Sequence, residues 1–325
     1  MTVMLEVLLS IVPVFLIIGV GTVVDRFHFL PAGSSSVLSA YLLRLGMPLV
    51  LLHIMAGADP ATLTQAGYWI ALIAAQGVVY AAGYGADVLL ARRGQGPAAM
   101  TALASSCCNA AFLGLAIIGS LFPGNAEAMI AAGIATITPA IVLVTGQVHL
   151  EILRQRKEGQ SRGVGPILVK SLLMNPMLWG ISLGIVLCVT GIGLWDPLAR
   201  AVGLVGSTCA PCALLALGLD MRARLNVAMK AKGHVALHQA GVISLKLIVH
   251  PLLAWALLAL LGVSGLWLAV GVLMAGTASA VAVYMVGEYY RTAPEECAFS
   301  VVLTNCLNLF TMAGFAYAFR VLGYV

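Results

Sequence analysis

Apolar segments of about 20 residues, each long enough to cross a bilayer as a helix, follow one another along almost the whole sequence. Ten such segments can be marked, at about residues 4–22, 34–57, 67–91, 97–121, 126–152, 167–191, 197–219, 235–261, 265–287 and 297–322. Charged residues make up 9% of the chain, against about 25% in an ordinary soluble domain. The sequence therefore predicts an all-α membrane protein with ten transmembrane helices.

The first apolar segment is expected to stay in the protein, because it contains Glu6 and lacks both the basic region and the clean cleavage site of a secretory signal. Most of the seven cysteines lie inside apolar segments, which favours a role as small residues in helix interfaces. Cys209 and Cys212 form a CxxC pair with no second pair or His cluster beside it. Neither a disulfide framework nor a metal site is expected, and no cofactor.

The basic residues are distributed unevenly between the loops. The odd-numbered loops hold thirteen of the 17 Lys and Arg residues: Arg26, Arg92, Arg93, Arg154, Arg156, Lys157, Arg162, Lys170, Arg222, Arg224, Lys230, Lys232 and Arg291. The even-numbered loops hold Arg200. The positive-inside rule therefore places the odd loops in the cytoplasm and both termini outside, in what we expect to be the inner membrane of a bacterium.

A polar run, RQRKEGQSR, divides the chain at its midpoint. The predicted organisation is a first five-helix repeat at residues 1–153, a cytoplasmic linker at 154–166 and a second five-helix repeat at 167–325. Since five is odd, the second repeat enters the membrane in the opposite direction, as in many secondary transporters. Pro48 in the second span and Pro211 in the seventh occupy matching mid-helix positions, which supports this symmetry.

Small and polar residues interrupt the fourth span near its middle, at Ser106, Cys107, Cys108 and Asn109. Asn and Ser compete for backbone hydrogen bonds and favour helix caps over helix interiors. A helix broken here would begin again at Ala110, with free N–H groups and a positive dipole end at the membrane centre, where an anion could bind. Alternatively, Asn109 only hydrogen-bonds a neighbouring helix.

The ninth span carries small residues at the matching depth. Thr277, Ala278 and Ser279 follow Gly276 there. Such residues let two helices approach closely. As the counterpart of the break in the fourth span, they predict a crossover and the other side of an anion site.

Two basic residues lie about halfway along apolar spans, Arg44 in the second and Lys246 in the eighth. A charge at this depth is costly and usually lines a cavity or has a partner. The acidic residues lie at span ends or in loops, and Asp87, toward the cytoplasmic edge, has Arg92 nearby. Fixed positive charge without a deep carboxylate favours an anionic substrate. Lys246 could cap carbonyls of broken helices or couple transport to an ion, whereas Arg44 keeps its proton and is expected in the substrate site.

Other polar residues also lie in apolar spans. His250 is one turn beyond Lys246 and is the better candidate for a titrating switch than His53. Asn305 and Asn308 in the tenth span are expected to hydrogen-bond neighbouring helices. No GxSxG, HExxH, P-loop or nucleic-acid module is present, so neither an enzyme nor a nucleic-acid partner is expected.

These features resemble the auxin efflux carrier family in its bacterial form, which includes malonate and related organic-acid transporters. The resemblance covers nearly the whole chain. It rests on LGMPLVLLHIMAG, NAAFLGLAIIG, NPMLWGISLGIVL, ALLALGLDM, LKLIVHPLLA and GEYYRTAPEECAFSVVLTNCLNLFT in this order and spacing.

The resemblance implies two inverted five-helix repeats, similar to NhaA and the bile-acid symporters, with broken helices 4 and 9 crossing at the centre. It implies a scaffold domain, a moving core domain and an organic anion as substrate. The family's crossover Asn falls on Asn109 and its span 8 Lys on Lys246. Many members carry prolines at both crossovers, whereas this chain has LGLA and TASA, which predicts gentler breaks.

The function expected from the sequence is secondary transport of a small carboxylate, with malonate as the first candidate. Coupling to a proton or to sodium is left open. The alternatives are a sodium-coupled symporter of the bile-acid type and a membrane sensor that binds the anion without moving it. The expected partners are the organic anion and the lipid bilayer, and small-residue faces on spans 2 and 7 would allow a homodimer.

Overall fold

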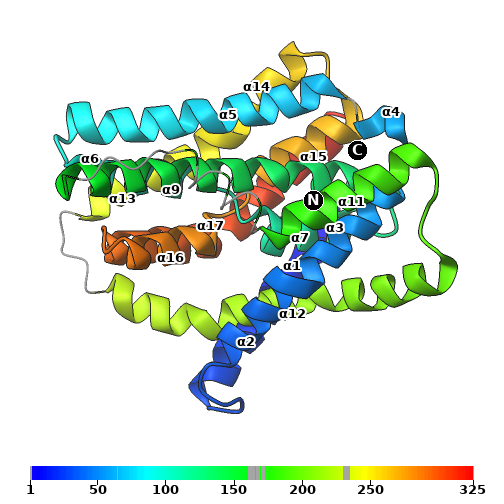
Figure 1. Cartoon of the computed structure of the whole chain (residues 1–325), viewed down its shortest axis with the longest axis horizontal. Helices are drawn as coiled ribbons and strands as arrows, with labels where there is room; N and C mark the ends of the chain where they lie inside the picture. The colour runs from blue at the N-terminus through cyan, green and yellow to red at the C-terminus, as the bar shows by residue number, and fades with distance from the viewer. Residues whose placement is uncertain are drawn as a thin grey trace.

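The computed structural model of the chain describes residues 2–63, 65–159, 165, 169, 173, 175–229 and 235–324. Helices make up most of this part of the chain (Figure 1). They are α1 Thr2–Arg26, α2 Ser34–Tyr41, η1 Leu42–Gly46, α3 Met47–Ala56, α4 Pro60–Leu63, α5 Ala66–Gly85, η2 Ala86–Leu90, α6 Gln95–Ser106, η3 Ala110–Gly114, α7 Leu115–Leu121, α8 Ala126–Ala135, α9 Ile137–Lys157, α11 Pro176–Thr190, α12 Asp196–Ala228, α13 Val235–Ser244, η4 Leu245–Val249, α14 His250–Leu260, α15 Gly265–Ala275, α16 Val281–Tyr289 and α17 Pro294–Val321, where η marks a π-helical turn.

Seven continuous helical segments of the described chain are long and apolar enough to cross a membrane. Three shorter apolar helices, Ala110–Leu121, Pro176–Thr190 and Gly265–Ala275, accompany them. The helical fold expected from the sequence is therefore confirmed, and the candidate spans are consistent with a membrane protein. The start of the sixth predicted span lies largely outside the described residues, as do linker residues 160–164 and 166 and the basic residues Arg162, Lys170, Lys230 and Lys232.

The helices form two groups that meet along α12 and α17. The first, here called the scaffold group, consists of α1, α2, η1, α3, α11 and α12, which pack mainly on one another. The second, the core group, contains α5 to α9 and α13 to α17. In Figure 1, α5, α6 and α9 run side by side toward the left, and α12 runs along the lower edge. The ends of the chain approach each other, since Arg320 Nη1 lies 3.3 Å from Glu6 Oε2.

Backbone-to-backbone packing holds the scaffold group together. Where α1 crosses α12, a Cβ added to Gly218 would lie 2.9 Å from the Cα of Gly21, closer than real Cβ atoms come to backbone. Where α11 crosses α3, a Cβ on Gly184 would lie 2.7 Å from the carbonyl oxygen of Leu52. Glycine at such contacts lets two helices approach closely. The helices then make dispersion contacts with each other in place of the contacts that they would make with lipid.

Two of the π-helical turns end two residues before a proline. η1 is followed by Met47 and Pro48, and η4 by His250 and Pro251. Proline lacks an N–H group, and its ring clashes with the carbonyl four residues earlier, so a widened turn relieves the clash. The residues of these turns are thereby rotated away from the directions that a regular helix would give them.

The close contact at Gly218 gives a prediction about stability. Gly218→Val should lower the free energy of unfolding by about 1–3 kcal/mol, because the new side chain has only backbone to displace. Thermal unfolding in detergent, followed by size-exclusion chromatography, measures the effect. Gly203→Val is the matched control, because Gly203 lies on the same helix with nothing within 4 Å of its added Cβ. Equal melting temperatures for the two variants would contradict the packing argument.

Candidate functional site

Two helices are interrupted, and their interruptions pair with each other. One break lies between α6 and η3, and the other between α15 and α16. An antiparallel β-bridge joins Cys108 to Ser279. Around it, Asn109 N donates to Ala278 O at 2.8 Å, and Ala280 N donates to Cys107 O at 3.0 Å. Both predicted breaks are therefore present, and they are complete rather than gentle. Each broken backbone supplies hydrogen bonds that the other has lost from its helix.

Side chains of other helices cap the carbonyl groups where α15 ends. Lys246 Nζ donates to Ala275 O at 2.8 Å, and Asn308 Nδ2 donates to Gly276 O at 2.8 Å. Lys246 thus has the capping role that its sequence position suggested, and Asn308 makes the predicted interhelical hydrogen bond. Asn305 does not, because its Nδ2 donates to Val301 O of its own helix at 2.7 Å.

The N-terminal ends of both second half-helices line one cavity of about 250 Å³. The residues that line it are Ser39, Leu43, Cys107, Cys108, Asn109, Ala110, Ala111, Phe112, Thr136, Pro139, Ala140, Leu143, Asn175, Met177, Ala280, Val281, Ala282 and Met285. The first N–H groups of a helix have no acceptor within that helix. Two positive dipole ends therefore meet at this cavity, which favours an anion there.

Asn109 is a polar side chain of this wall whose donor group is buried without a partner among the described residues. It is 5% exposed, and its Nδ2 has no hydrogen-bond partner among the residues that the structure describes. Asn109 lies directly before η3. Its backbone carbonyl accepts the first hydrogen bonds of that turn, from Leu113 N and Gly114 N, both at 3.0 Å. An amide N–H₂ group can donate to a carboxylate. The alternative role considered for Asn109 was a hydrogen bond to a neighbouring helix. Its Nδ2 makes no such bond within the described chain.

The other residues predicted for the site fall into two sets. Cys107, Cys108 and Ala110 line the cavity together with Asn109. Four more are buried in the crossover without lining the cavity, and they are Ser106, Thr277, Ala278 and Ser279. The hydroxyls in this second set donate to backbone carbonyls: Ser106 to Ala102, Thr277 to Met274 and Ser279 to Ala104. The cavity wall from the ninth span is instead formed by Ala280–Ala282 and Met285, whereas Ser279 is held in the β-bridge.

Arg44 is not brought to this cavity. It lies in η1, where it is exposed, whereas Ser39 and Leu43 of the same segment line the cavity. Within this widened turn Leu43 contributes to the cavity wall and the next residue, Arg44, does not. His53, one of the two histidines considered for a switch, is also exposed.

Lys246 and His250 lie in a buried polar cluster next to the crossover. Both side chains are 0% exposed. Lys246 Nζ lies 3.0 Å from Cys108 Sγ and 3.1 Å from His250 Nδ1. Gln76 of α5 adds a contact from its Nε2 to Cys108 Sγ at 3.5 Å. Sequence reasoning missed Gln76, although a single amide in the apolar run ALIAAQGVVY was a usable signal.

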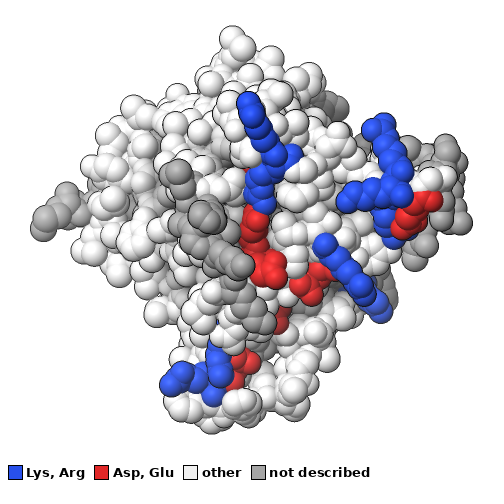
Figure 2. Space-filling view, turned by 90° about the vertical axis from the view of Figure 1, so that its left-hand side faces the viewer, with Lys and Arg blue, Asp and Glu red and all other residues white. Residues whose placement is uncertain are grey.

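Charged residues gather at the end of the core group formed by the odd loops, and Figure 2 shows Lys, Arg, Asp and Glu together on this face. Asp87 accepts from Thr101 Oγ1 at 2.7 Å and lies 2.7 Å from His238 Nε2 and 3.4 Å from Arg93 Nη1. The basic partner is thus Arg93 and not the expected Arg92. Arg92 has a left-handed backbone, with φ of 52°, at the turn that brings Arg93 back over Asp87.

Three polar residues of the cavity wall were also missed. Thr136 lies between α8 and α9, and its hydroxyl donates to Gly133 O at 2.6 Å. Asn175 caps α11, where its Oδ1 accepts from Met177 N at 3.1 Å. Asn175 begins the run NPMLW, which carries the Asn-Pro pattern of a helix start. Ser39 gave no such signal in a segment rich in serine.

Comparisons with known proteins agree with this arrangement. The sequence matches a family described as "Membrane transport protein" over residues 6–316. The chain therefore belongs to this family, the auxin efflux carrier family, and the resemblance noted in the sequence is confirmed. A similar protein from Rhizobium meliloti (strain 1021), described as "Putative malonate transporter", is 21% identical, over 98% of this chain and 97% of its own length. The family and this relative are transporters, and a multi-pass membrane protein fits both.

The two asparagines of α17 allow a test of the capping argument. Asn308→Ala should lower the free energy of unfolding by about 1–3 kcal/mol, because the Gly276 carbonyl loses its donor in a buried site. Asn305→Ala should cost less, because the carbonyl that Asn305 contacts belongs to its own helix. Thermal unfolding of both variants in detergent compares the two. A larger loss for Asn305→Ala would show that the cap is not the stabilising contact.

Proposed function

We propose that this protein is a secondary active transporter of a small carboxylate anion, with malonate as the first candidate, working by alternating access. The name of the relative supports malonate as the first anion to try. Membership of a membrane transport family supports transport over sensing.

The observation on which the proposal depends is the pair of half-helix N-termini, at Ala110 and Val281, that line one cavity with the free amide of Asn109. A carboxylate bound there would accept hydrogen bonds from Asn109 Nδ2 and from backbone N–H groups at both helix ends. Thr136 and Asn175 provide further polar groups on the wall, and a cavity of about 250 Å³ is ample for a three-carbon dicarboxylate.

The position of the cavity suggests how access would alternate. Ser39, Leu43, Asn175 and Met177 of its wall come from the scaffold side, and the other lining residues come from the core group. A cavity between two helix groups changes its access when one group rocks against the other. Beyond the crossover, α16 runs from the cavity wall toward the loop after Tyr289, an odd loop. The structure would then face the cytoplasm, if the odd loops are cytoplasmic as the basic residues suggest.

Ten spans arranged as two inverted five-helix repeats are part of the proposal. Packing within the scaffold group supports it, because the first span packs along the seventh (α1 on α12) and the sixth along the second (α11 on α3). Such reciprocal pairs are expected when two halves are related by a twofold axis in the membrane plane. The two breaks, in the fourth and ninth spans, agree with the same symmetry. A homodimer is also still a proposal.

Transport into proteoliposomes tests the function. Labelled malonate should enter vesicles containing the protein, and Asn109→Ala should reduce its apparent affinity roughly 10- to 100-fold, because a hydrogen bond to a charged group is lost. Asn226→Ala is the matched control, since Asn226 is exposed on α12 and is not part of the cavity wall. Uptake of other acids but not malonate would reject the substrate, and unchanged affinity in Asn109→Ala would reject the site.

The proposed orientation can be tested separately in cells. Alkaline phosphatase fused after Tyr324 should be active, because the C-terminus is expected in the periplasm, where its disulfides form. Green fluorescent protein fused at the same position should give little fluorescence. The opposite pattern would invert the orientation and place the cavity toward the outside.

A further inference from the structure

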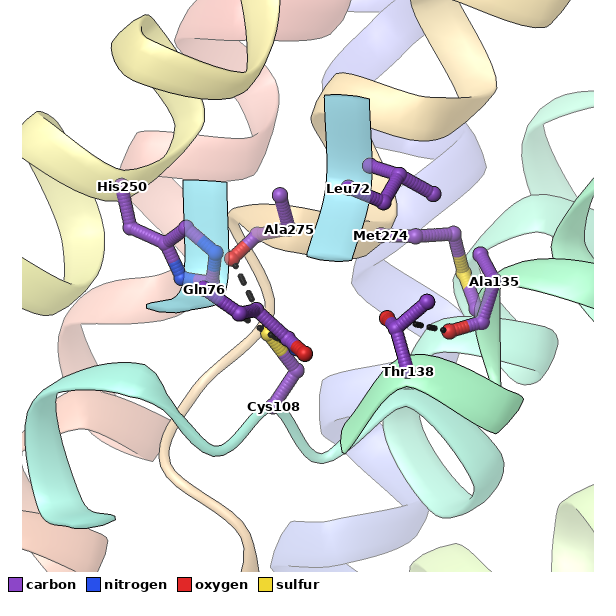
Figure 3. Close-up of a pocket in the computed structure, with 8 residues that line it drawn as sticks. All are labelled: Leu72, Gln76, Cys108, Ala135, Thr138, His250, Met274 and Ala275. Carbon is purple, nitrogen blue, oxygen red and sulfur yellow. Dashed lines mark hydrogen bonds between the residues drawn. The ribbon is translucent and has the colours of Figure 1, made fainter. Parts of the chain in front are cut away.

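A second cavity lies within the core group and shares Cys108 with the wall of the first. Its volume is about 10 Å³, close to the space that one water molecule occupies. The lining residues, shown in Figure 3, are Leu72, Gln76, Cys108, Ala135, Thr138, His250, Met274 and Ala275. In this view the imidazole of His250, the amide of Gln76 and the thiol of Cys108 surround the same small space.

Two atoms of this wall have unsatisfied hydrogen-bonding capacity. Gln76 Oε1 and His250 Nε2 have no partner within the described part of the chain, and the two side chains are 2% and 0% exposed. When Lys246 is an ammonium, it has only hydrogens to offer, so His250 Nδ1 accepts from it and the ring proton lies on Nε2. His250 Nε2 then needs an acceptor, while Gln76 Oε1 needs a donor. One water molecule between them satisfies both.

We propose that this cavity binds a single water molecule and that Lys246, His250 and this water form a proton site coupled to the anion at Asn109. The inference rests on the proposed transport of a carboxylate. When the site loses its proton, Lys246 Nζ gives a proton to His250 Nδ1 while His250 Nε2 gives one to the water. The water passes that proton on to solvent in the larger cavity. Imidazole and amine are both neutral afterwards, and one proton has left.

The charge of Lys246 links the proton to the anion. Lys246 contacts Cys108, whose neighbour Asn109 carries the amide proposed to bind the carboxylate. An ammonium on one side of this segment and a carboxylate on the other attract each other through the buried protein between them, where screening is weak. Linkage is reciprocal, so a proton on Lys246 strengthens anion binding by the same factor by which the anion strengthens proton binding.

No carboxylate competes for this role in the described structure. The turn η4 packs against α5, α6, α13, α14 and α17. Of the titratable side chains on and beside these helices, Cys108 and His250 contact Lys246. The carboxylates Asp87 and Glu296 instead pair with Arg93 and His238 at the odd-loop end. Sodium is disfavoured in the same cavity, because an ammonium beside it would repel a second cation.

Proteoliposome assays with malonate test the proton site. In wild type, with the membrane potential held at zero, an outside medium about one pH unit more acidic than the vesicle lumen should drive roughly tenfold accumulation of malonate, because one proton enters with each anion. A sodium gradient should drive none. Malonate counterflow, in which labelled malonate exchanges with unlabelled malonate inside, needs no net proton movement. Lys246→Gln should keep measurable counterflow, because its amide can still donate to Ala275 O, but should lose the response to the acid gradient. Gln76→Leu, which removes the acceptor for the water, should weaken that response.

The outcomes separate the two proposals. Absence of malonate counterflow in wild type overturns the proposed function, and the proton site with it. Counterflow without acid-driven accumulation, or accumulation driven by sodium, overturns the proton site alone. If Lys246→Gln does not fold, calorimetry of malonate binding to the wild type in buffers of different ionisation enthalpy decides. Uptake of about one proton per malonate supports the site, and no proton uptake rejects it.

Discussion

The structure depends on one constraint, which is that a backbone N–H or C=O group inside a bilayer must be paired unless it lines a water-filled cavity. Two helices that break near the middle of the core violate this constraint unless something replaces the lost hydrogen bonds. The two breaks replace part of them for each other, through the bridge between Cys108 and Ser279. Lys246 and Asn308 replace more, by capping the carbonyls at the end of α15. A lysine and an asparagine deep inside apolar helices are therefore requirements of the fold before they are parts of a mechanism.

Around the breaks in the described chain, the carbonyl groups are hydrogen-bonded to protein donors, whereas the N–H groups of the second half-helices are not. This difference makes the cavity electropositive. The carbonyl ends of the first half-helices meet protein donors that are fixed in place. The N–H ends of the second half-helices, beginning at Ala110 and Val281, meet a cavity. Donors without acceptors and two positive dipole ends then face the same space, with the Asn109 amide beside them. The same interruption that the bilayer makes costly would thus favour an anion without any cationic side chain in the cavity wall.

Sequence predicted the features that follow from residue type and depth. The breaks followed from small and polar residues in two apolar spans, and the capping role of Lys246 followed from a buried charge without a carboxylate. Which side chains face the cavity could not be predicted in the same way. Arg44 and Leu43 are neighbours, yet only Leu43 lines the wall, and the widened turn before Pro48 sets their directions. The register of the bridge likewise places Ala280 rather than Ser279 at the cavity. Neither effect leaves a periodic signal in the sequence.

The distribution of the lining residues bears on what would move during transport. Every group proposed to hold the carboxylate at the crossover belongs to the core, and the scaffold contributes one end of the wall, including Asn175. A rocking core would therefore carry the anion with it and would exchange only the scaffold contacts, so binding need not be lost when access changes. The buried cluster of Lys246 and His250 would move as part of the same body, since η4 packs on other core helices. Its hydrogen bonds to the crossover would then be kept in both orientations, and protonation there would act on the charge balance of the moving unit and not on a gate.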